Sequence, residues 1–336
     1  MRGLGPHGER AAPADKLALM ADEVIAARAG RFTLAIVLHT VTSDWARLVA
    51  AGIGETLSAH SGAVVEIVDC SFDKAIQNRE LSRLAQSRID AVISVPVGVS
   101  GLSHAYREVS KAGKKLILID NAPAGMMPGA DYVAVVSTDN FNLGEIAAAL
   151  LSPHVADEGV AGILTYSADF FAANEREIAF RKWIGANRPD LTLVRGRFAA
   201  VEDAGAAFNR LYKENPDLDG LFVTWDVPAI HALEAIRAAP RDMPVTTVDL
   251  GEAIAAELAN GDLVKGVAAQ RPYDLGVAAA ITALMSLIGR HPPPWIVTPG
   301  IPVTRDNLAE AHQAIWPAIA GTGAADESAT PAPHRP

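Results

Sequence analysis

The sequence predicts an α/β protein of two Rossmann-like lobes, each a parallel β-sheet with helices on both faces. From Phe32 onward, short apolar runs alternate with amphipathic segments, which is typical of buried parallel strands joined by helices. The chain has 336 residues, enough for about two domains. The apolar runs also outnumber the strands that one nucleotide-binding half requires. Two five- or six-stranded sheets, dividing near residues 137–140, fit them better.

The apolar pattern fixes the expected elements in order. Strands are expected at 33–39, 63–69, 90–95, 115–120, 132–137, 160–166, 191–196, 220–225, 244–249 and 264–270. Helical periodicity predicts helices at 44–60, 74–88, 100–112, 140–152, 171–187, 202–214, 227–238, 251–260 and 272–288. Because open parallel sheets bind ligands at the carboxyl ends of their strands, functional side chains are expected directly after the strands.

The two ends of the chain depart from this pattern. Residues 15–28 have apolar side chains on one face and predict a single amphipathic helix. Within the first 30 residues the longest apolar run, 17–21, is too short for an export signal, so no signal peptide is expected there. Residues 321–336 are rich in Ala, Pro, Thr and Gly and predict a disordered tail.

Composition excludes several classes of function. The net charge of −10 and the pI near 5.4 argue against nucleic acid or an anionic membrane as a partner. No apolar stretch reaches 18 residues, so no membrane-spanning helix is expected. The single cysteine, Cys70, rules out an intramolecular disulfide and a thiolate metal cluster.

The motifs of common enzyme classes are missing. A GxGxxG match at residues 3–8 precedes every strand and has Pro6 where a phosphate-binding turn would lie. The sequence has no GxxxxGK[ST] loop, no GxSxG elbow and no HExxH or HxH pair. We therefore expect no catalytic residues, no cofactor and no metal.

The predicted strand ends instead carry carboxylates, amides and tryptophans. Asp, Asn and Gln exchange hydrogen bonds with hydroxyl groups, and an indole covers the apolar face of a sugar ring. Trp45 and Trp225 each follow a strand, although packing remains an alternative for both. The other three tryptophans, Trp183, Trp295 and Trp316, are expected to pack without touching ligand. This pattern favours a small polyhydroxylated ligand between two lobes.

From about Phe32 to Leu308 the chain resembles the ribose-type sugar-binding proteins of bacterial ABC importers, which have the type I periplasmic binding protein fold. The same fold forms the effector domains of lactose-repressor-type regulators. The resemblance lies in LHTVTSDW (38–45), LILIDNAPAG (116–125), VVSTDNFNLGEIAAALL (135–151), ADFFAANEREIAFRKWI (168–184), NPDLDGLFVTWDVPAIHAL (215–233), VTTVDLGEAIAAELANGDLVKGVAAQRPYDLG (245–276) and PVTRDNL (302–308).

The resemblance implies how the chain is divided. Three hinge crossings between the lobes are expected near 137–140, 270–272 and 298–302. The implied parts are an N-terminal extension with a helix (1–30), an N-terminal lobe (31–137 plus 271–298), a C-terminal lobe (138–270 plus 299–318) and a disordered tail (319–336).

The resemblance also implies a ligand-binding set at the strand ends. Its members are His39, Ser43, Asp44, Trp45, Asp120, Asn121, Phe171, Asn174, Trp225, Asp226, Asp249 and Gln270. Two positions depart from the family pattern. Asn174 replaces an arginine, with Arg176 nearby, and Trp225 replaces an asparagine. These departures argue against ribose and favour another small sugar or polyol.

Structural alternatives stay open for four of these residues. Asp249 and Gln270 would serve equally as hydrogen-bonding residues of a hinge or loop. Asp120 and Asn121, followed by Ala122 and Pro123, would fit a simple turn.

The implied function is that of a monomeric substrate-binding protein that closes on a sugar and delivers it to an ABC permease. The alternative is a cytosolic sugar-sensing domain without a DNA-binding headpiece. The family implies a periplasmic location, whereas the lack of a signal in the first 30 residues favours the cytoplasm. Neither the ligand nor the choice between import and sensing follows from the sequence.

Overall fold

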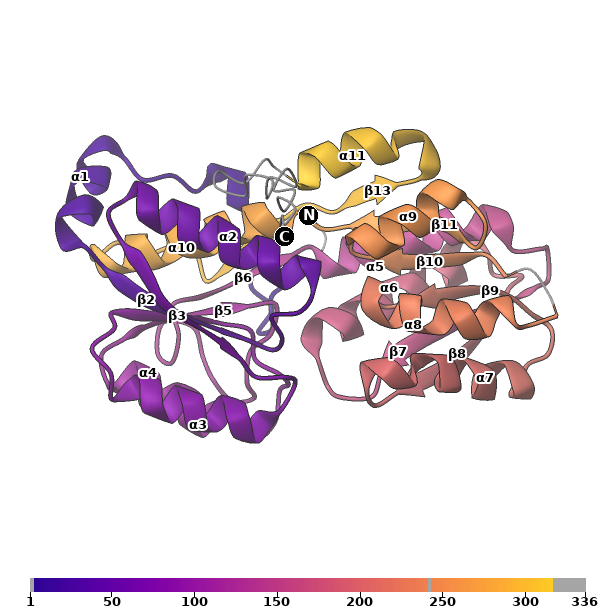
Figure 1. Ribbon diagram of the computed structural model, residues 1–336, viewed down its shortest axis with the longest axis horizontal. Helices are drawn as coiled ribbons and strands as arrows, with labels where there is room; N and C mark the ends of the chain where they lie inside the picture. Colours follow the sequence, from indigo (N-terminus) through magenta and orange to yellow (C-terminus); the bar gives the residue numbers. More distant parts are fainter. Residues whose placement is uncertain (1–2, 241–242, 317–336) are drawn as a thin grey trace, which may run out of the picture.

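The computed structural model describes residues 3–240 and 243–316, whose strands form two separate sheets lying side by side (Figure 1). We call each sheet with its covering helices a lobe. In spatial order the first sheet contains β1 (Ala12–Pro13), β12 (Trp295–Thr298), β6 (Ala134–Thr138), β5 (Lys115–Ile119), β4 (Ala91–Ser94), β2 (Thr33–Leu38) and β3 (Ala63–Asp69). All of its pairings are parallel.

The second sheet has the same construction with one exception. In spatial order it contains β13 (Ile301–Val303), β11 (Val264–Ala269), β10 (Val245–Val248), β9 (Leu218–Val223), β7 (Val160–Tyr166) and β8 (Thr192–Phe198). Only the edge strand β13 runs antiparallel to its neighbour. The predicted α/β class with parallel sheets is therefore confirmed within the described residues.

Helices cover both faces of each sheet (Figure 1). In the first lobe α2 (Asp44–Ala59) and α10 (Pro272–Leu287) pack on one face, and α3 (Lys74–Ala85) and α4 (Ser103–Lys111) on the other. In the second lobe the faces belong to α5 (Asn140–Leu151) with α6 (Phe171–Asn187), and to α7 (Ala204–Glu214), α8 (Asp226–Arg237), α9 (Glu252–Asn260) and α11 (Leu308–Ile315). The inner strands β2, β4, β5 and β9 are almost fully buried because helices cover both of their faces, whereas the edge strands β3 and β8 are partly exposed.

The chain passes from one sheet to the other at three places. It leaves the first sheet after β6, returns from β11 to α10, and leaves again between β12 and β13. The carboxyl ends of β6, β11 and β12 therefore meet at the junction of the lobes. Side chains that follow these strands are shared by both lobes.

The N-terminal segment differs from the prediction of one helix over 15–28. The helix α1 is shorter, Ala21–Gly30, and starts after Met20, whose extended backbone and N–H bond to the Glu23 carboxylate form its N-terminus. The apolar face expected to be buried is not: Ile25 is 70% exposed, whereas Leu17 packs on the first core from outside the helix. Leu17 and Leu19 pack on the first core from the chain before α1, so only the second half of the predicted segment is helical.

Part of the predicted N-terminal extension is built into the first lobe. Residues 12–13 form β1, which pairs with β12 and so forms the edge of the first sheet. Neither strand was predicted, because two and four residues are too few to show a period and Pro292–Pro294 interrupt the pattern before β12. The predicted tail, 319–336, lies outside the described residues.

Small residues let two helix pairs approach closely. A Cβ at Gly276 of α10 would lie 2.2 Å from the carbonyl oxygen of Val49 in α2. A Cβ at Gly144 of α5 would lie 2.2 Å from the carbonyl oxygen of Arg176 in α6. The second contact fixes α6 against α5 at the turn that carries Arg176, and this sets the position of its guanidinium.

No helix in the described part of the chain combines the length and apolar character needed to cross a membrane.

Candidate ligand-binding site

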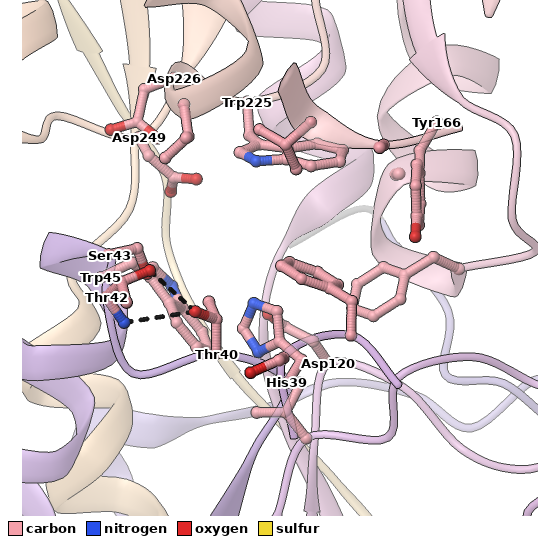
Figure 2. A pocket seen from close by; sticks show the side chains of 18 of the residues that line it. His39, Thr40, Thr42, Ser43, Trp45, Asp120, Tyr166, Trp225, Asp226 and Asp249 are labelled. Atoms are coloured by element: carbon pink, nitrogen blue, oxygen red, sulfur yellow. Dashed lines mark hydrogen bonds between the residues drawn. The ribbon is translucent and has the colours of Figure 1, made fainter. Parts of the chain in front are cut away.

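A pocket of about 540 Å³ lies between the lobes, lined by the loops that follow strands of both sheets (Figure 2). From the first lobe it is lined by His39, Thr40, Thr42, Ser43, Trp45, Asp69, Ser71, Phe72, Val95 and Asp120. From the second lobe it is lined by Tyr166, Phe170, Ala173, Arg176, Ala199, Ala200, Val201, Glu202, Trp225, Asp226, Val227, Asp249 and Gln270. The strand ends thus form the pocket walls, as expected for open parallel sheets.

The structure brings most of the sequence-predicted binding set together in this pocket. The members that line it are His39, Ser43, Trp45, Asp120, Trp225, Asp226, Asp249 and Gln270. They come from both lobes, and Figure 2 shows Trp225, Asp226 and Asp249 across the pocket from His39 and Asp120. A ligand between them would contact both lobes at once.

Two of the pocket carboxylates sit on strained backbone. Asp120 follows β5 with φ of 59°, and Asp249 follows β10 with φ of 73°, both in the left-handed region that side chains rarely adopt. Asp tolerates this conformation better than most residues, yet it still costs free energy in the folded state. Such strain is concentrated at binding sites, and here it turns both carboxylates at the strand ends into the pocket.

A hydrogen-bonded chain joins Asp120 to Arg176 across the first crossing. The Ser137 hydroxyl donates to Asp120 Oδ1 at 2.6 Å, and Asn140 Nδ2 donates to Ser137 Oγ at 3.0 Å. Arg176 Nε in turn donates to Asn140 Oδ1 at 2.8 Å, and its Nη1 donates to the Thr224 carbonyl at 2.9 Å. The guanidinium is held from both sides and is buried in the pocket wall.

A second chain of hydrogen bonds joins Asp249 to all three crossings. Gln270 Nε2 donates to Asp249 Oδ1 at 2.7 Å, and Gln270 Oε1 accepts from the Thr138 hydroxyl at 2.6 Å. Thr138 Oγ1 lies 3.1 Å from Thr298 Oγ1. Residues 138, 270 and 298 belong to three different crossings, so Gln270 lines the pocket and also bonds to the first crossing. Its predicted ligand contact and its alternative role in a hinge both stay predictions.

The buried carboxylates resist ionisation. Burial raises the pKa of Asp120, Asp226 and Asp249 above the ordinary range. At Asp249 the Arg176 guanidinium and the Gln270 amide offset part of this effect. At Asp226 the neighbouring Asp249 raises the pKa further, while the N–H of Gly251, 3.1 Å from Asp226 Oδ2, opposes it. Asp226 is the pocket carboxylate whose charge is least compensated.

Aromatic rings form the rest of the wall. The His39 ring lies 4.9 Å from the Phe72 ring and 5.5 Å from Trp45, and burial lowers the His39 pKa to about 4, so the imidazole is neutral at pH 7. On the opposite lobe the Tyr166 and Trp225 rings meet edge to face at 5.6 Å. Flat apolar surfaces facing carboxylates suit a ligand with hydroxyls on one side and C–H groups on another.

Asp44 and Asn121 belong to the predicted set but do not line the pocket. Asp44 Oδ2 instead accepts the N–H of Glu252 at 2.8 Å, a bond from the first lobe to the first turn of α9 in the second. Asn121 is fully buried behind the pocket, where its Oδ1 accepts the Phe171 N–H at 3.3 Å. Both residues join the lobes rather than face the cavity.

Phe171 and Asn174 also lie outside the lining. The Phe171 ring packs edge to face on Trp295 at 6.0 Å, and Asn174 Nδ2 donates to Asp169 at 2.6 Å in an exposed contact. Their place in the wall is taken by Phe170 and Arg176. The predicted aromatic residue is thus one position too late and the predicted polar residue two positions too early. Sequence alone does not fix the rotation of α6 about its axis, and that rotation decides which side chains face the pocket.

Sequence reasoning missed several other lining residues. Tyr166 ends β7 and Phe170 lies in the stretch that follows it, but nothing in the sequence distinguishes them from their neighbours. Phe72 lies in the loop that follows β3, so an aromatic residue shortly after a strand is a usable signal for it. The lining segment 199–202 follows the edge strand β8 and carries no such signal.

The remaining tryptophans do not line the pocket. Trp295 is buried in the first lobe, Trp183 packs on the core of the second, and Trp316 donates its indole N–H to the Leu250 carbonyl at 3.1 Å. Among the described residues, no cluster of three or more His, Cys, Asp or Glu side chains is arranged to hold a metal ion.

Two lobes of parallel sheet, three crossings and a pocket lined from both sides define a class of two-lobed proteins that enclose a small ligand. Comparison with known proteins gives the family. Residues 34–291 match the model of the periplasmic binding protein domain, and the chain belongs to that family. The predicted resemblance is thereby confirmed, and so is the expectation of a binding protein rather than an enzyme.

Individual relatives are distant but cover most of the chain. The ribose import binding protein RbsB of Bacillus subtilis (strain 168) is 26% identical over 253 residues, 75% of this chain and 80% of the relative. A D-ribose/D-allose-binding protein of Pseudomonas aeruginosa is 25% identical over 224 residues, 66% of this chain and 70% of the relative.

Solved structures share the fold. A carbohydrate transporter solute-binding protein of Agrobacterium radiobacter in complex with D-arabinose has a TM-score of 0.77 at 21% identity, covering 85% of this chain and 99% of that chain. An ABC transporter solute-binding protein of Agrobacterium vitis with bound D-fucose has a TM-score of 0.76 at 22% identity, covering 84% of this chain and 100% of that chain.

Proposed function

We propose that the chain is the substrate-binding protein of an ABC importer and encloses a small sugar or polyol between its two lobes. The observation that carries this proposal is the pocket between the lobes, in which aromatic faces and buried carboxylates, amide and guanidinium groups converge. The names of the relatives support a sugar as the ligand class. The departure at Trp225 argues against ribose itself, whereas Arg176 supplies an arginine in the wall where Asn174 was expected.

The mechanism follows from which side chains come from which lobe. His39, Trp45 and Asp120 belong to the first lobe, and Arg176, Trp225 and Asp249 to the second. A ligand that bonds to both sets gains its full interaction energy only when the lobes are closed, so it shifts the population towards the closed form. The three crossings absorb the rotation as hinges.

Closure also creates the signal that a permease would recognise. The Asp44 bond to the Glu252 N–H joins the rims of the two lobes outside the pocket. We propose that this closed rim, presented by a monomer in the periplasm, docks on the permease. A cytosolic sensing domain is not favoured, because the named relatives are import and sugar-binding proteins.

A thermal-shift screen tests the ligand class. Pentoses, hexoses, 6-deoxy sugars and polyols are each added in excess, and a true ligand raises the unfolding temperature by mass action.

Two pocket variants test the binding site. For the best ligand we expect Trp225→Ala and Asp249→Ala to weaken binding by at least about tenfold in calorimetry, or ~1.4 kcal/mol. Asp157→Asn, which changes an almost fully exposed carboxylate, is the matched control. Unchanged affinity in both pocket variants would refute this pocket as the binding site.

A further inference from the structure

The pocket between the lobes is lined by more acidic than basic side chains. Its lining contains five carboxylates, from Asp69, Asp120, Glu202, Asp226 and Asp249, and one guanidinium, from Arg176. Asp120, Asp226 and Asp249 are only 4%, 9% and 8% exposed, and Arg176 is 5% exposed. His39 adds no charge near neutral pH because its imidazole is uncharged there. Three buried carboxylates therefore share one buried cation, an arrangement that burial makes costly.

The single guanidinium does not reach all three carboxylates. Arg176 Nη1 lies 4.0 Å from Asp249 Oδ2, and Asp249 accepts a further bond from Gln270. Asp120 accepts a bond from the Ser137 hydroxyl. Asp226 has only neutral partners: its Oδ2 accepts the Gly251 N–H, and no ion pair joins it to a cation among the described residues. Asp226 is thus the buried acidic side chain of the pocket with the least compensation for a negative charge.

Other acidic groups reinforce this corner of the pocket. Asp44 of the opposite lobe approaches the same Gly251 from the other side: a Cβ there would lie 2.6 Å from Asp226 Oδ2 and 2.9 Å from Asp44 Oδ2. Arg47 pairs with Asp44 on the outer surface, where its side chain is 57% exposed. On the inner side Arg176 lies near Asp249, and no cation among the described residues pairs with Asp226.

An aromatic surface lies next to the uncompensated charge. Trp225 directly precedes Asp226, and Figure 2 shows its indole on the same side of the pocket as Asp226 and Asp249. Tyr166 meets the indole edge to face and holds its orientation. A carboxylate beside the face of an indole is favourable for an ammonium group, which gains ion pairing and cation–π attraction together.

Building on the proposed function, we propose that the ligand is a polyhydroxylated amine, an amino sugar or amino polyol, whose ammonium group lies at Asp226 and Asp249 beside Trp225. Its hydroxyls face Asp120 and Arg176. The ammonium supplies the positive charge that the buried carboxylates lack. With a neutral sugar as the ligand, a carboxylate at this position would have to bind a proton instead.

Calorimetry with matched sugars tests the amino group. The probes are D-glucosamine, N-acetyl-D-glucosamine and D-glucose, and the corresponding galactose series, titrated into the intact protein near neutral pH. We expect an amino sugar to bind at least about tenfold more tightly than both its N-acetyl form and its neutral parent. The preference should fall with added salt, since it is electrostatic. Equal or tighter binding of a neutral parent, with proton uptake revealed by buffer-dependent enthalpies, would overturn the amino-group proposal.

Variants locate the ammonium. Asp226→Asn keeps the shape of the side chain and removes its charge, so the ratio of the amino sugar's affinity to the neutral parent's affinity should fall about tenfold. Asp249→Asn is the second variant, in case the first does not fold, and Asp157→Asn controls for net charge. Retention of the full preference in both pocket variants would overturn the proposal. If no sugar binds in any form, the proposed function itself is refuted, whereas binding of neutral sugars alone refutes only the amino group.

Discussion

Replacing Arg176 by Met should destabilise the protein strongly and in a pH-dependent way. Met has a similar length but no charge, so Asp249 loses a cation 4.0 Å away. At an effective dielectric constant of about 20 that interaction is worth about 4 kcal/mol. Asn140 Oδ1 and the Thr224 carbonyl also lose their donor. Removing one partner of a buried pair typically costs about 3–5 kcal/mol, which agrees with the Coulomb figure.

The sign of the pH dependence follows from the carboxyl pKa values. Burial already raises the pKa of Asp120 and Asp249, and Arg176 opposes this. Without Arg176 both pKa values rise further. A carboxyl whose folded pKa exceeds its unfolded value loses stabilisation as pH rises through the folded pKa. The variant should therefore lose more stability relative to the parent at pH 7.5 than at pH 5.

Urea unfolding at the two pH values measures both effects. Arg176→Lys, which keeps the charge but loses the planar set of donors, should cost less than Arg176→Met. The double variant Arg176→Met with Asp249→Asn should recover part of the loss. A loss below about 1 kcal/mol, the size of an exposed ion pair, or an equal loss at both pH values, would refute the electrostatic reasoning.

Three further changes have definite expected outcomes. The His39 pKa of about 4 lies below its unfolded value of about 6.5, so the neutral imidazole stabilises the fold above pH 6.5 and this stabilisation is lost as pH falls. Between pH 7.5 and pH 5 the parent's free energy of unfolding should therefore fall by up to about 2 kcal/mol more than that of His39→Asn. Thr138→Val removes the hydroxyl that donates to Gln270, so it should lower the free energy of unfolding in urea by about 1–3 kcal/mol and speed amide exchange at the crossings. Thr282→Val is the control, because the Thr282 hydroxyl bonds only within its own helix, and it should leave amide exchange at the crossings unchanged. Gly276→Ala should cost about 1–3 kcal/mol because its Cβ meets a carbonyl of α2, and an equal loss from Gly54→Ala, where the space is open, would contradict this explanation.

Much of the fold could be predicted because long apolar runs and amphipathic helices leave strong periodic signals. The helix at 171–187 matches α6 residue for residue, and the strand at 63–69 matches β3. The predictions failed where the pattern is short or ambiguous. Residues 12–13 are too few to show alternation, and the apolar residues of 15–28 serve two purposes, one part packing as extended chain and the other forming α1.

The candidate site was predictable at strand ends and less so on helices. Asp120, Asp249 and Gln270 follow strands directly, so their position at the sheet edge was fixed by the strand assignment. Phe171 and Asn174 lie on the first turn of α6, where a rotation of about 100° per residue decides which side chain faces the pocket. That rotation is fixed by tertiary contacts such as Gly144 against α6, which a single sequence does not reveal.

The interleaving of the lobes has a consequence for folding during synthesis. The first sheet needs β12 and α10 to cover its core, yet these segments are made only after all five parallel strands of the second lobe, β7 to β11. Until then, one apolar face of the sheet formed by residues 33–138 would remain exposed to solvent, and such a state is prone to aggregation. The pairing of β1 with β12, which spans nearly the entire chain, forms only at the end. The second lobe follows the first in the sequence, yet its parallel strands are all available before the first lobe is complete.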